Sequence, residues 1–278
     1  MPRLWRSMLY VPANVPRFVT KAAGSGADAV VLDLEDSVPI DRKDEARAAL
    51  ASAIPEIQAG GPEVLVRVNR PLAVAVPDIL AARAAGAQGI LLTKVLGPDH
   101  VVLAAELMAG SGMRIIPMLE TAAALLRAEA IGRAHPAVAG LLIGAEDLAT
   151  ELGAAADDEI IVLAKRQMAI AAIAAGVAPF GTLGTVADFR DPAHVTRVVA
   201  AARRSGFVGA TCIHPSLVTI LNEGYGPSAA EVDLARRQLE AAAAAAAEGR
   251  GSFTVDGRMV DEPILIRARR ILAQSSTQ

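Results

Sequence analysis

The sequence predicts an α/β fold, a (β/α)8 barrel with an extension at the C-terminal end of the chain. Short apolar runs alternate with Ala-rich stretches of helical spacing, at about 25–30 residues per unit over eight units. This alternation is typical of parallel strands joined by crossover helices, and eight units in about 220 residues match a barrel. A doubly wound sheet would more often begin with a Gly-rich turn, and no G-x-G-x-x-G pattern follows the first run.

Each predicted strand is a short apolar run, and each predicted helix is a longer stretch rich in alanine. At Pro98-Asp99 and Asp191-Pro192, an acidic cap and a proline indicate helix starts. The predicted strands are 7–11, 29–34, 64–68, 90–95, 115–119, 140–143, 178–183 and 210–213, and the predicted helices include 46–53, 101–108, 121–131, 160–175 and 194–204.

The pattern changes after the last predicted strand. Residues 228–247 indicate one long helix, because Ser228 and Glu231 form a capping-box sequence and the segment ends in an alanine run. A stretch rich in glycine and charge interrupts it, and a last helix is predicted over 263–272. We therefore predict two parts, a catalytic barrel over 1–223 and an appended segment over 224–278.

The composition argues against several classes of protein. The net charge is −3, which gives no indication of nucleic acid or an anionic membrane as a partner. Cys212 is the one cysteine, so no intrachain disulfide is possible, as expected in a reducing compartment. No apolar stretch approaches the roughly 20 residues of a membrane span, and the N-terminal segment lacks the features of a signal peptide. We therefore expect a cytoplasmic protein.

Two acidic residues sit just past the ends of apolar runs. Glu120 follows the fifth predicted strand and Asp147 the sixth. In a barrel, the carboxyl ends of the strands line the active site, so both carboxylates should lie at the same end. Carboxylates gathered there would repel one another, and a bound Mg²⁺, which prefers oxygen ligands, removes that cost. We predict Glu120 and Asp147 as metal ligands.

The same rule places further side chains at that end of the barrel. Arg67 would bind an anionic oxygen of the substrate, because its planar fork suits a carboxylate. Glu35 or Asp36 would hold metal-bound water, and both are candidate catalytic residues. His214 is a weaker candidate, because a His-Pro pair can simply end a strand. The other strand-end residues are Asn14, Asp33, Asn69, Lys94 and Glu146, of which we assign Asn69 and Lys94 to substrate binding.

Several motifs resemble one known family, in order and along essentially the whole chain. The chain resembles the citrate lyase β-subunit-like family, part of the HpcH/HpaI aldolase group that includes malyl-CoA and citramalyl-CoA lyases. The motifs are Arg6-Ser-Met-Leu-Tyr-Val-Pro, Ala27-Asp-Ala-Val-Val-Leu-Asp-Leu-Glu-Asp-Ser-Val-Pro, Val66-Arg-Val-Asn, Leu119-Glu-Thr-Ala, Gly144-Ala-Glu-Asp-Leu, Cys212-Ile-His-Pro and Gly257-Arg-Met-Val-Asp-Glu-Pro.

The resemblance implies a barrel with a C-terminal helical lid, usually in a homotrimer. It also implies Mg²⁺-dependent cleavage or formation of a carbon–carbon bond in a β-hydroxyacyl-CoA thioester, where Mn²⁺ can substitute. Glu120 and Asp147 match the metal ligands, and Arg67 matches the residue that binds the keto-acid oxygens. Asp261 matches a lid carboxylate that acts as acid or base in a neighbouring subunit's site. Arg17 is a hypothesised contact for the phosphates of coenzyme A.

Two positions depart from the family pattern. Gly181 stands where the family often carries Asp, and Ala210 stands where a Lys is common. Lys94 is retained, but within Leu-Thr-Lys-Val instead of Leu-Pro-Lys. These departures bear on substrate identity more than on metal binding.

Three functions therefore remain open from the sequence. The first is a stand-alone CoA-thioester lyase. The second is a Mg²⁺-dependent acyl-CoA thioesterase on the same scaffold. The third is the β subunit of a carrier-protein-linked citrate lyase complex, or a barrel kept for interaction. One barrel fold hosts many reactions, so the fold alone does not decide among them.

Overall fold

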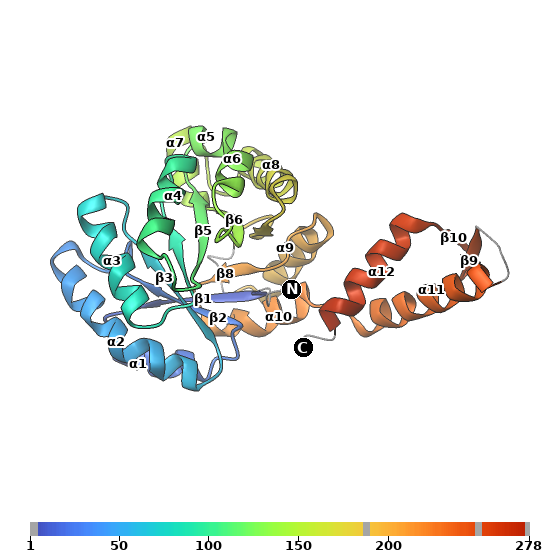
Figure 1. Ribbon diagram of the computed structural model, residues 1–278, viewed down its shortest axis with the longest axis horizontal. Coiled ribbons are helices and arrows are strands. Elements are labelled where there is room, and N and C mark those ends of the chain that lie inside the picture. Colours follow the sequence, from blue (N-terminus) through green and yellow to red (C-terminus); the bar gives the residue numbers. More distant parts are fainter. Residues whose placement is uncertain (1–4, 186–189, 248–251, 276–278) are drawn as a thin grey trace. The chain divides into compact units, whose positions relative to one another are not determined.

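The computed structural model describes residues 5–185, 190–247 and 252–275 of the chain. The chain divides into two compact units, one over Leu4–Tyr225 and one that includes Gly226–Gln278. The two units are described separately below and are coloured along the sequence in Figure 1. Among the helices of these described residues, none is both long enough and apolar enough to cross a membrane.

The first unit is a barrel of eight parallel strands (Figure 1). The strands are hydrogen-bonded in the order β7-β6-β5-β4-β3-β2-β1-β8, and a parallel bridge from Phe180 to Gly209 connects the two ends of this series. The predicted (β/α)8 barrel is confirmed. The strands are β1 Ser7–Pro12, β2 Ala29–Asp33, β3 Glu63–Val68, β4 Gly89–Leu92, β5 Arg114–Leu119, β6 Gly140–Ile143, β7 Ala178–Phe180 and β8 Ala210–Cys212.

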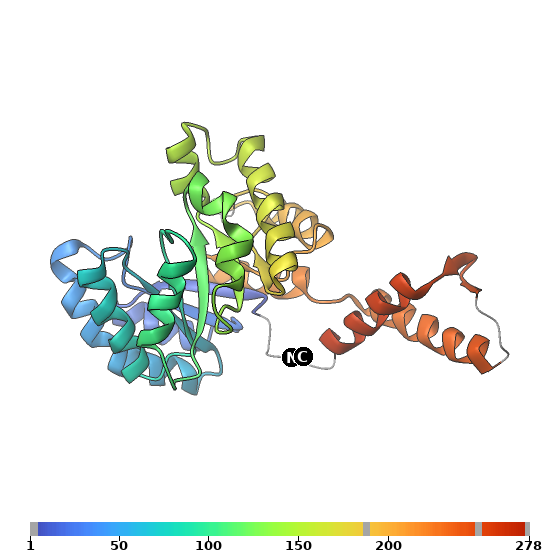
Figure 2. The same ribbon diagram turned by 45° about the horizontal axis from the view of Figure 1, so that its top comes forward.

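At least one helix follows each strand, and the helices cover the outside of the ring (Figure 2). The helices are α1 Pro16–Ala23, α2 Lys43–Ala59, α3 Leu72–Ala84, α4 Pro98–Leu107, α5 Ala122–Leu126, α6 Ala128–Arg133, α7 Ala145–Leu152, α8 Glu159–Ala175, α9 Pro192–Arg204 and α10 Val218–Tyr225, with short 3₁₀ turns η1 Ile40–Arg42 and η2 Pro215–Leu217.

Three details differ from the sequence prediction. The helix expected over 121–131 is two helices, because Arg127 has φ −107° and ψ 11° and ends α5. The fourth and seventh strands end early, where Lys94 (φ 47°) and Gly181 (φ 142°) leave the extended conformation. Asp191 caps α9 as expected, but Asp99 lies in the first turn of α4, whose cap position is Gly97.

The strands separate two apolar cores, because successive side chains point to opposite faces of the sheet. The outer core lies between the strands and the helices and consists mainly of Ala, Val, Leu and Ile. The inner core fills the barrel, and its buried members are Trp5, Met8, Ala29, Val31, Leu65, Leu91, Ile116, Met118, Leu142 and Phe180. The barrel is therefore a packed interior and not a pore.

The amino end of the barrel is closed by an aromatic and ionic cluster. Trp5 is 1% exposed, and its Nε1 donates a hydrogen bond to Glu63 Oε2 at 2.8 Å. Arg114 pairs with the same Glu63 oxygen, and its Cζ lies 4.0 Å from the centre of a Trp5 ring. A cation over an indole face adds to the stability of such a pair.

The second unit is a helix–hairpin–helix. Helices α11 (Ala229–Ala247) and α12 (Glu262–Ser275) pack together, and strands β9 (Phe253–Val255) and β10 (Arg258–Val260) pair antiparallel. The capping box is confirmed, because Ser228 and Glu231 bond each other's backbone N–H. The hairpin was not predicted. Asp256 and Gly257 both have positive φ at its turn, and an Asp-Gly pair is a signal for such a turn.

Candidate active site

The carboxyl end of the barrel carries the charged side chains predicted from the strand ends. Counting in steps of two from inner-core residues Val31, Leu65 and Met118 leads to Asp33, Arg67 and Glu120. Asp33 and Arg67 are also direct cross-strand neighbours in the register of β2 and β3. Alternation along the strands thus places three charged groups on top of the apolar interior.

Arg67 and Asp33 form a buried, bidentate ion pair. Arg67 Nε donates to Asp33 Oδ1 at 2.7 Å, and Arg67 Nη2 donates to Asp33 Oδ2 at 2.6 Å. Burial opposes ionisation of Asp33, but the hydrogen bonds from Arg67 and Ser37 outweigh it and hold the pKa of Asp33 below its usual value. The fork of Arg67 therefore faces Asp33, and a substrate oxygen would meet its remaining N–H groups.

The other edge of Arg67 faces two more carboxylates. Its Nη1 donates to Asp36 Oδ2 at 2.9 Å and lies 3.2 Å from Glu35 Oε2. Glu35 Oε1 accepts a hydrogen bond from Lys94 Nζ at 2.5 Å. Burial raises the pKa of Glu35 despite these cations. Glu35, Asp36, Arg67 and Lys94, all predicted from strand ends, are thus brought together in one network.

Glu120 is the most deeply buried of the predicted metal ligands. The residue is 3% exposed, and Oε2 accepts a hydrogen bond from the backbone N–H of Lys94. Burial raises the pKa of Glu120 to about 7, the charges of Asp147 and Glu35 add to the shift, and the Lys94 N–H opposes it. A nearby cation would reverse this shift by favouring the carboxylate.

Gly144 leaves space for the Glu120 side chain. A Cβ atom at position 144 would lie 2.4 Å from Glu120 Cγ and 2.6 Å from Oε1. Gly144 has φ −79° and ψ 94°, a conformation open to any residue, so this close approach is the reason that glycine suits the position.

Asp147 lies in the first turn of α7, directly after β6, and its charge reaches Glu120. In the part of the chain that the structure describes, no group of three or more His, Cys, Asp or Glu side chains is arranged to hold a metal. Two carboxylates still fit Mg²⁺, which is often held by one or two carboxylates with the other positions filled by substrate and water. The raised pKa of Glu120 agrees with a site suited to a cation.

Two residues outside the prediction, the partly buried Tyr10 and the buried Lys43, also belong to this end of the barrel. The ring of Tyr10 lies 4.9 Å from Arg67 Cζ, and its hydroxyl contacts the sulfur of Met118. Lys43 Nζ donates to the carbonyl oxygens of Leu34 and Glu35, at 2.7 and 2.5 Å, and so fixes the loop after β2. Tyr10 could have been found from the sequence, because it lies two positions after Met8 on β1 and therefore on the same face of the strand.

Asn69 is part of a separate buried cluster. Its Nδ2 donates to Asp78 Oδ2 at 2.6 Å and to Leu34 O at 2.9 Å, and Asp78 also pairs with Arg47. Both contacts attach Asn69 to the scaffold. A contact of Asn69 with substrate stays a prediction.

The structure gives three other predicted residues local roles. Arg17 is exposed on α1, where its Cζ lies 4.8 Å from the ring centre of Phe18. His214 caps η2 by accepting a hydrogen bond from Ser216 N. Asp261, in the second unit, is exposed and accepts a bond from Ile264 N at 3.3 Å at the start of α12. Their functional roles stay predictions.

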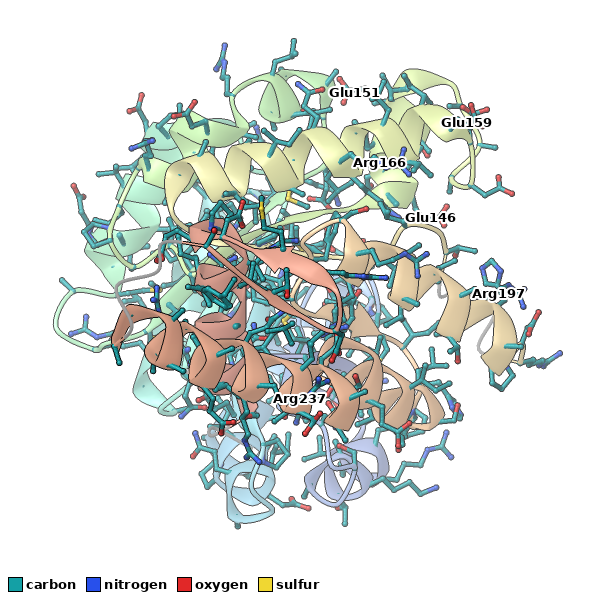
Figure 3. The ribbon with its side chains drawn as sticks, turned by 90° about the vertical axis from the view of Figure 1, so that its right-hand side faces the viewer. Glu146, Glu151, Glu159, Arg166, Arg197 and Arg237 are labelled. Carbon is teal, nitrogen blue, oxygen red and sulfur yellow. The ribbon has the colours of Figure 1, made fainter. Side chains whose placement is uncertain are left out.

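A buried lysine on α8, which the sequence analysis missed, contacts the loop after β7. Lys165 on α8 is 6% exposed and donates to Gly184 O at 3.0 Å. Burial lowers the pKa of Lys165 to about 8, and the charge of Glu146 opposes this shift. Glu146 on α7 and Arg166 on α8 are labelled in Figure 3.

The two departures from the family pattern have clear structural settings. Gly181 has φ 142°, a backbone conformation that an Asp would rarely adopt. Ala210 is 1% exposed and packs in the outer core, between strand and helices. A lysine at 210 would therefore have to enter packed apolar space.

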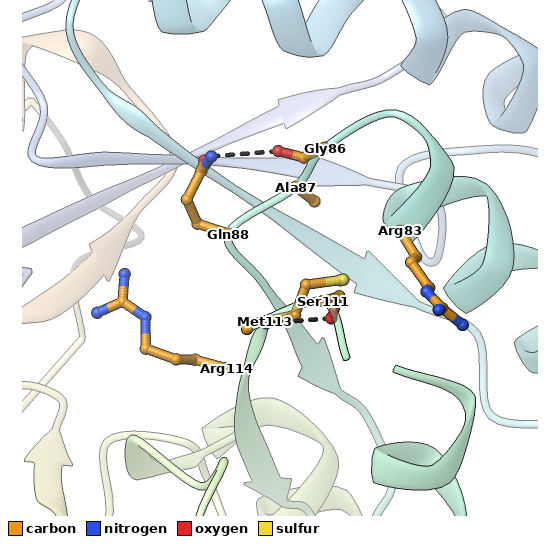
Figure 4. Close-up of a pocket in the computed structure, with 8 residues that line it drawn as sticks. Arg83, Gly86, Ala87, Gln88, Ser111, Met113 and Arg114 are labelled. Carbon is orange, nitrogen blue, oxygen red and sulfur yellow. Dashed lines mark hydrogen bonds between the residues drawn. The ribbon is translucent and has the colours of Figure 1, made fainter. Parts of the chain in front are cut away.

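One hollow lies at the opposite end of the barrel (Figure 4). It has a volume of about 240 Å³ and is formed by the turns that precede β4 and β5, with side chains of Arg83, Gln88, Ser111 and Arg114 around it. Gln88 Nε2 donates to Gly86 O at 3.1 Å within it. Because it is at the amino end, this hollow is separate from the carboxylates above.

Comparison with known proteins shows the family to which the chain belongs. The family model for HpcH/HpaI aldolase/citrate lyase matches residues 6–215. The citrate lyase subunit beta-like protein of Deinococcus radiodurans is 35% identical over 283 residues, covering 99% of each chain. The (3S)-malyl-CoA thioesterase of Cereibacter sphaeroides is 35% identical over 274 residues, covering 98% of this chain and 94% of that protein.

A solved structure is similar along most of the chain. Protein CitE from Mycobacterium tuberculosis, in complex with magnesium, acetoacetate and coenzyme A, superimposes with a TM-score of 0.79 at 30% identity, covering 97% of each chain. The sequence resemblance is therefore confirmed. The chain belongs to the HpcH/HpaI aldolase/citrate lyase family.

Proposed function

We propose that this protein is a Mg²⁺-dependent carbon–carbon lyase that acts on a β-hydroxyacyl-CoA thioester. Its products would be a keto acid and an acyl-CoA, and the reverse reaction would be the condensation. The observation that carries the proposal is the buried Glu120, whose carboxylate interacts with the charge of Asp147 and is bonded to Lys94 of the network around Arg67. The complex of the M. tuberculosis relative with magnesium, acetoacetate and coenzyme A supports the same chemistry.

Glu120 and Asp147 would hold the metal. Bound Mg²⁺ would act as a Lewis acid and template for the keto-acid oxygens, and Mn²⁺ would take its place with the same ligands. Glu35 and Asp36 both pair with Arg67, the charge of Glu35 reaches Glu120, and both residues would orient water or substrate by hydrogen bonds.

In the lyase direction, a base removes the proton of the β-hydroxyl group. The bond between the α and β carbons then breaks, the β carbon becomes the carbonyl of the keto acid, and the electron pair passes to the α carbon of the thioester, which takes up a proton from an acid to give the acyl-CoA. Arg67 and Lys94 would stabilise negative oxygen as it develops. Asp261 is our candidate acid and base, supplied by the lid of a neighbouring subunit. Arg17 would contact the phosphates of coenzyme A.

A thioesterase is the second candidate, because one relative that is 35% identical has that name. In that reaction water would attack the thioester carbonyl and release free coenzyme A. The role of β subunit in a carrier-protein-linked complex is a third candidate. It rests on the citrate lyase relatives, and a tightly bound acyl-carrier partner would support it.

The products distinguish these functions. The purified protein should be incubated with Mg²⁺ and a panel of hydroxyacyl-CoA thioesters, with malyl-CoA and citramalyl-CoA among them. Keto acid with acyl-CoA identifies a lyase, and free coenzyme A with the hydroxy acid identifies a thioesterase. Full activity in excess chelator would rule out the metal role of Glu120 and Asp147.

A further inference from the structure

We propose that Lys94 positions the metal-binding carboxylate of Glu120 through its backbone, in addition to any role of its side-chain charge. The inference rests on the proposed metal role of Glu120. The turn after β4 would then help to form the metal site, together with the acidic residues.

The backbone of Lys94 has a conformation that is unusual for its residue type. Its φ is 47°, and among the described residues only Asp256 is another non-glycine with positive φ. Asp256 lies in a hairpin turn, where such a conformation is common. An L-residue with a side chain pays more than glycine to adopt this region, so a lysine held there indicates a local function.

This conformation directs the N–H of Lys94 at Glu120. The N–H donates to Glu120 Oε2, and the next residue, Val95, donates its N–H to Met118 O at 3.4 Å. The turn after β4 is therefore attached twice to β5 and its end. On the other side, Gly144 gives the carboxylate room. The N–H and the glycine together fix the orientation of Glu120.

Glycine would provide the same N–H in this conformation with less strain. The Lys94 side chain, however, is used as well, because Nζ lies 2.5 Å from Glu35 Oε1 and 3.9 Å from Asp36 Oδ1. One residue thus connects the buried carboxylate of Glu120 to the network around Arg67. This double use explains why the position holds a lysine despite its backbone conformation.

Two variants separate the backbone role from the charge. Lys94→Gly and Lys94→Ile both remove the ammonium group, but glycine accepts positive φ and β-branched isoleucine strongly disfavours it. Lys94→Asn keeps a side chain and also tolerates positive φ. Lys94→Ala tolerates positive φ less well than glycine but better than isoleucine. Mn²⁺ alone is titrated into each full-length protein, and free Mn²⁺ is measured by electron paramagnetic resonance. Circular dichroism confirms that each variant is folded.

We expect Lys94→Gly and Lys94→Asn to bind Mn²⁺ within about threefold of the wild type. Lys94→Ile should bind about 10–100-fold more weakly, as is typical when a hydrogen-bond partner of a metal ligand is lost. If Lys94→Ile does not fold, Lys94→Ala should still bind more weakly than Lys94→Gly.

Equal affinity of the folded Gly, Ala and Ile variants would overturn the inference and leave the metal site intact. Absence of Mn²⁺ binding by the wild-type protein would overturn the metal assignment itself, and the inference with it. Because the assay contains no substrate, loss of catalytic activity for another reason does not affect the result.

Discussion

Gly144→Ala should displace the carboxylate of Glu120 without straining the backbone. The new Cβ would lie 2.4 Å from Glu120 Cγ, whereas ordinary contacts begin at 3.4 Å, so one of the two groups must move by about 1 Å. A displacement of that size at a reacting centre can cost about 10²-fold in rate, which corresponds to about 2.7 kcal/mol. We expect kcat/KM on a cleaved hydroxyacyl-CoA to fall by about that factor and Mn²⁺ affinity to fall with it.

Gly24→Ala is the matched control. Gly24 ends α1 with φ −96°, and a Cβ atom there would meet nothing within 4 Å. Both variants lower the entropy of the unfolded chain equally, so a difference between them arises in the folded state. The control should keep wild-type kcat/KM and gain or keep stability. Wild-type turnover and metal affinity in Gly144→Ala would show that the contact with Glu120 does not constrain the site.

Three further predictions address charge and assembly. With chelator present, the pKa of Glu120 is about 7 in the folded protein, compared with its usual value of 4.5. The folded state therefore binds the proton more tightly than the unfolded state does. The stability that this proton contributes is complete below pH 4.5 and lost by about pH 7. Urea unfolding should therefore show a fall of about 3 kcal/mol in the free energy of unfolding over this pH range, and Glu120→Gln should abolish the fall. Arg67→Ala should cost about 3 kcal/mol of stability, because it removes the ion pair of Asp33. Arg67→Lys should cost most of that, because an ammonium group cannot keep both bonds to Asp33. A lysine variant with wild-type stability and keto-acid affinity would contradict this prediction. Asp261→Asn and Glu120→Gln should each be nearly inactive, and co-refolding the two should restore part of the activity; mixed oligomers without recovery would exclude action of Asp261 in a neighbouring subunit.

The barrel was predictable because the strands alternate strictly with the helices. Each apolar run marks a strand buried on both faces, and this signal does not depend on distant contacts. The split at Arg127 was not predictable from periodicity, because apolar spacing continues across it. The hairpin over Phe253–Val260 was predictable from Asp256-Gly257, but its strands are only three residues long.

The gathering of the candidate site residues was predictable, and their contacts were less so. Residues at strand ends gather at one end of a barrel, which is sufficient to bring Glu35, Arg67 and Lys94 together. The partner of Arg67 was not identified, although Asp33 and Arg67 occupy the same register position on neighbouring strands. The backbone bond from Lys94 to Glu120 depends on a single φ angle, and a sequence with lysine at that position does not indicate positive φ.

The closed amino end of the barrel has a consequence for engineering. Trp5, Glu63 and Arg114 stabilise the fold at the end opposite to the carboxylates, with the packed inner core between. Stabilising substitutions often reduce activity where they stiffen a reactive centre. Here heat resistance could be increased around Trp5, and substrate range altered around Gly144, as two independent directions of directed evolution.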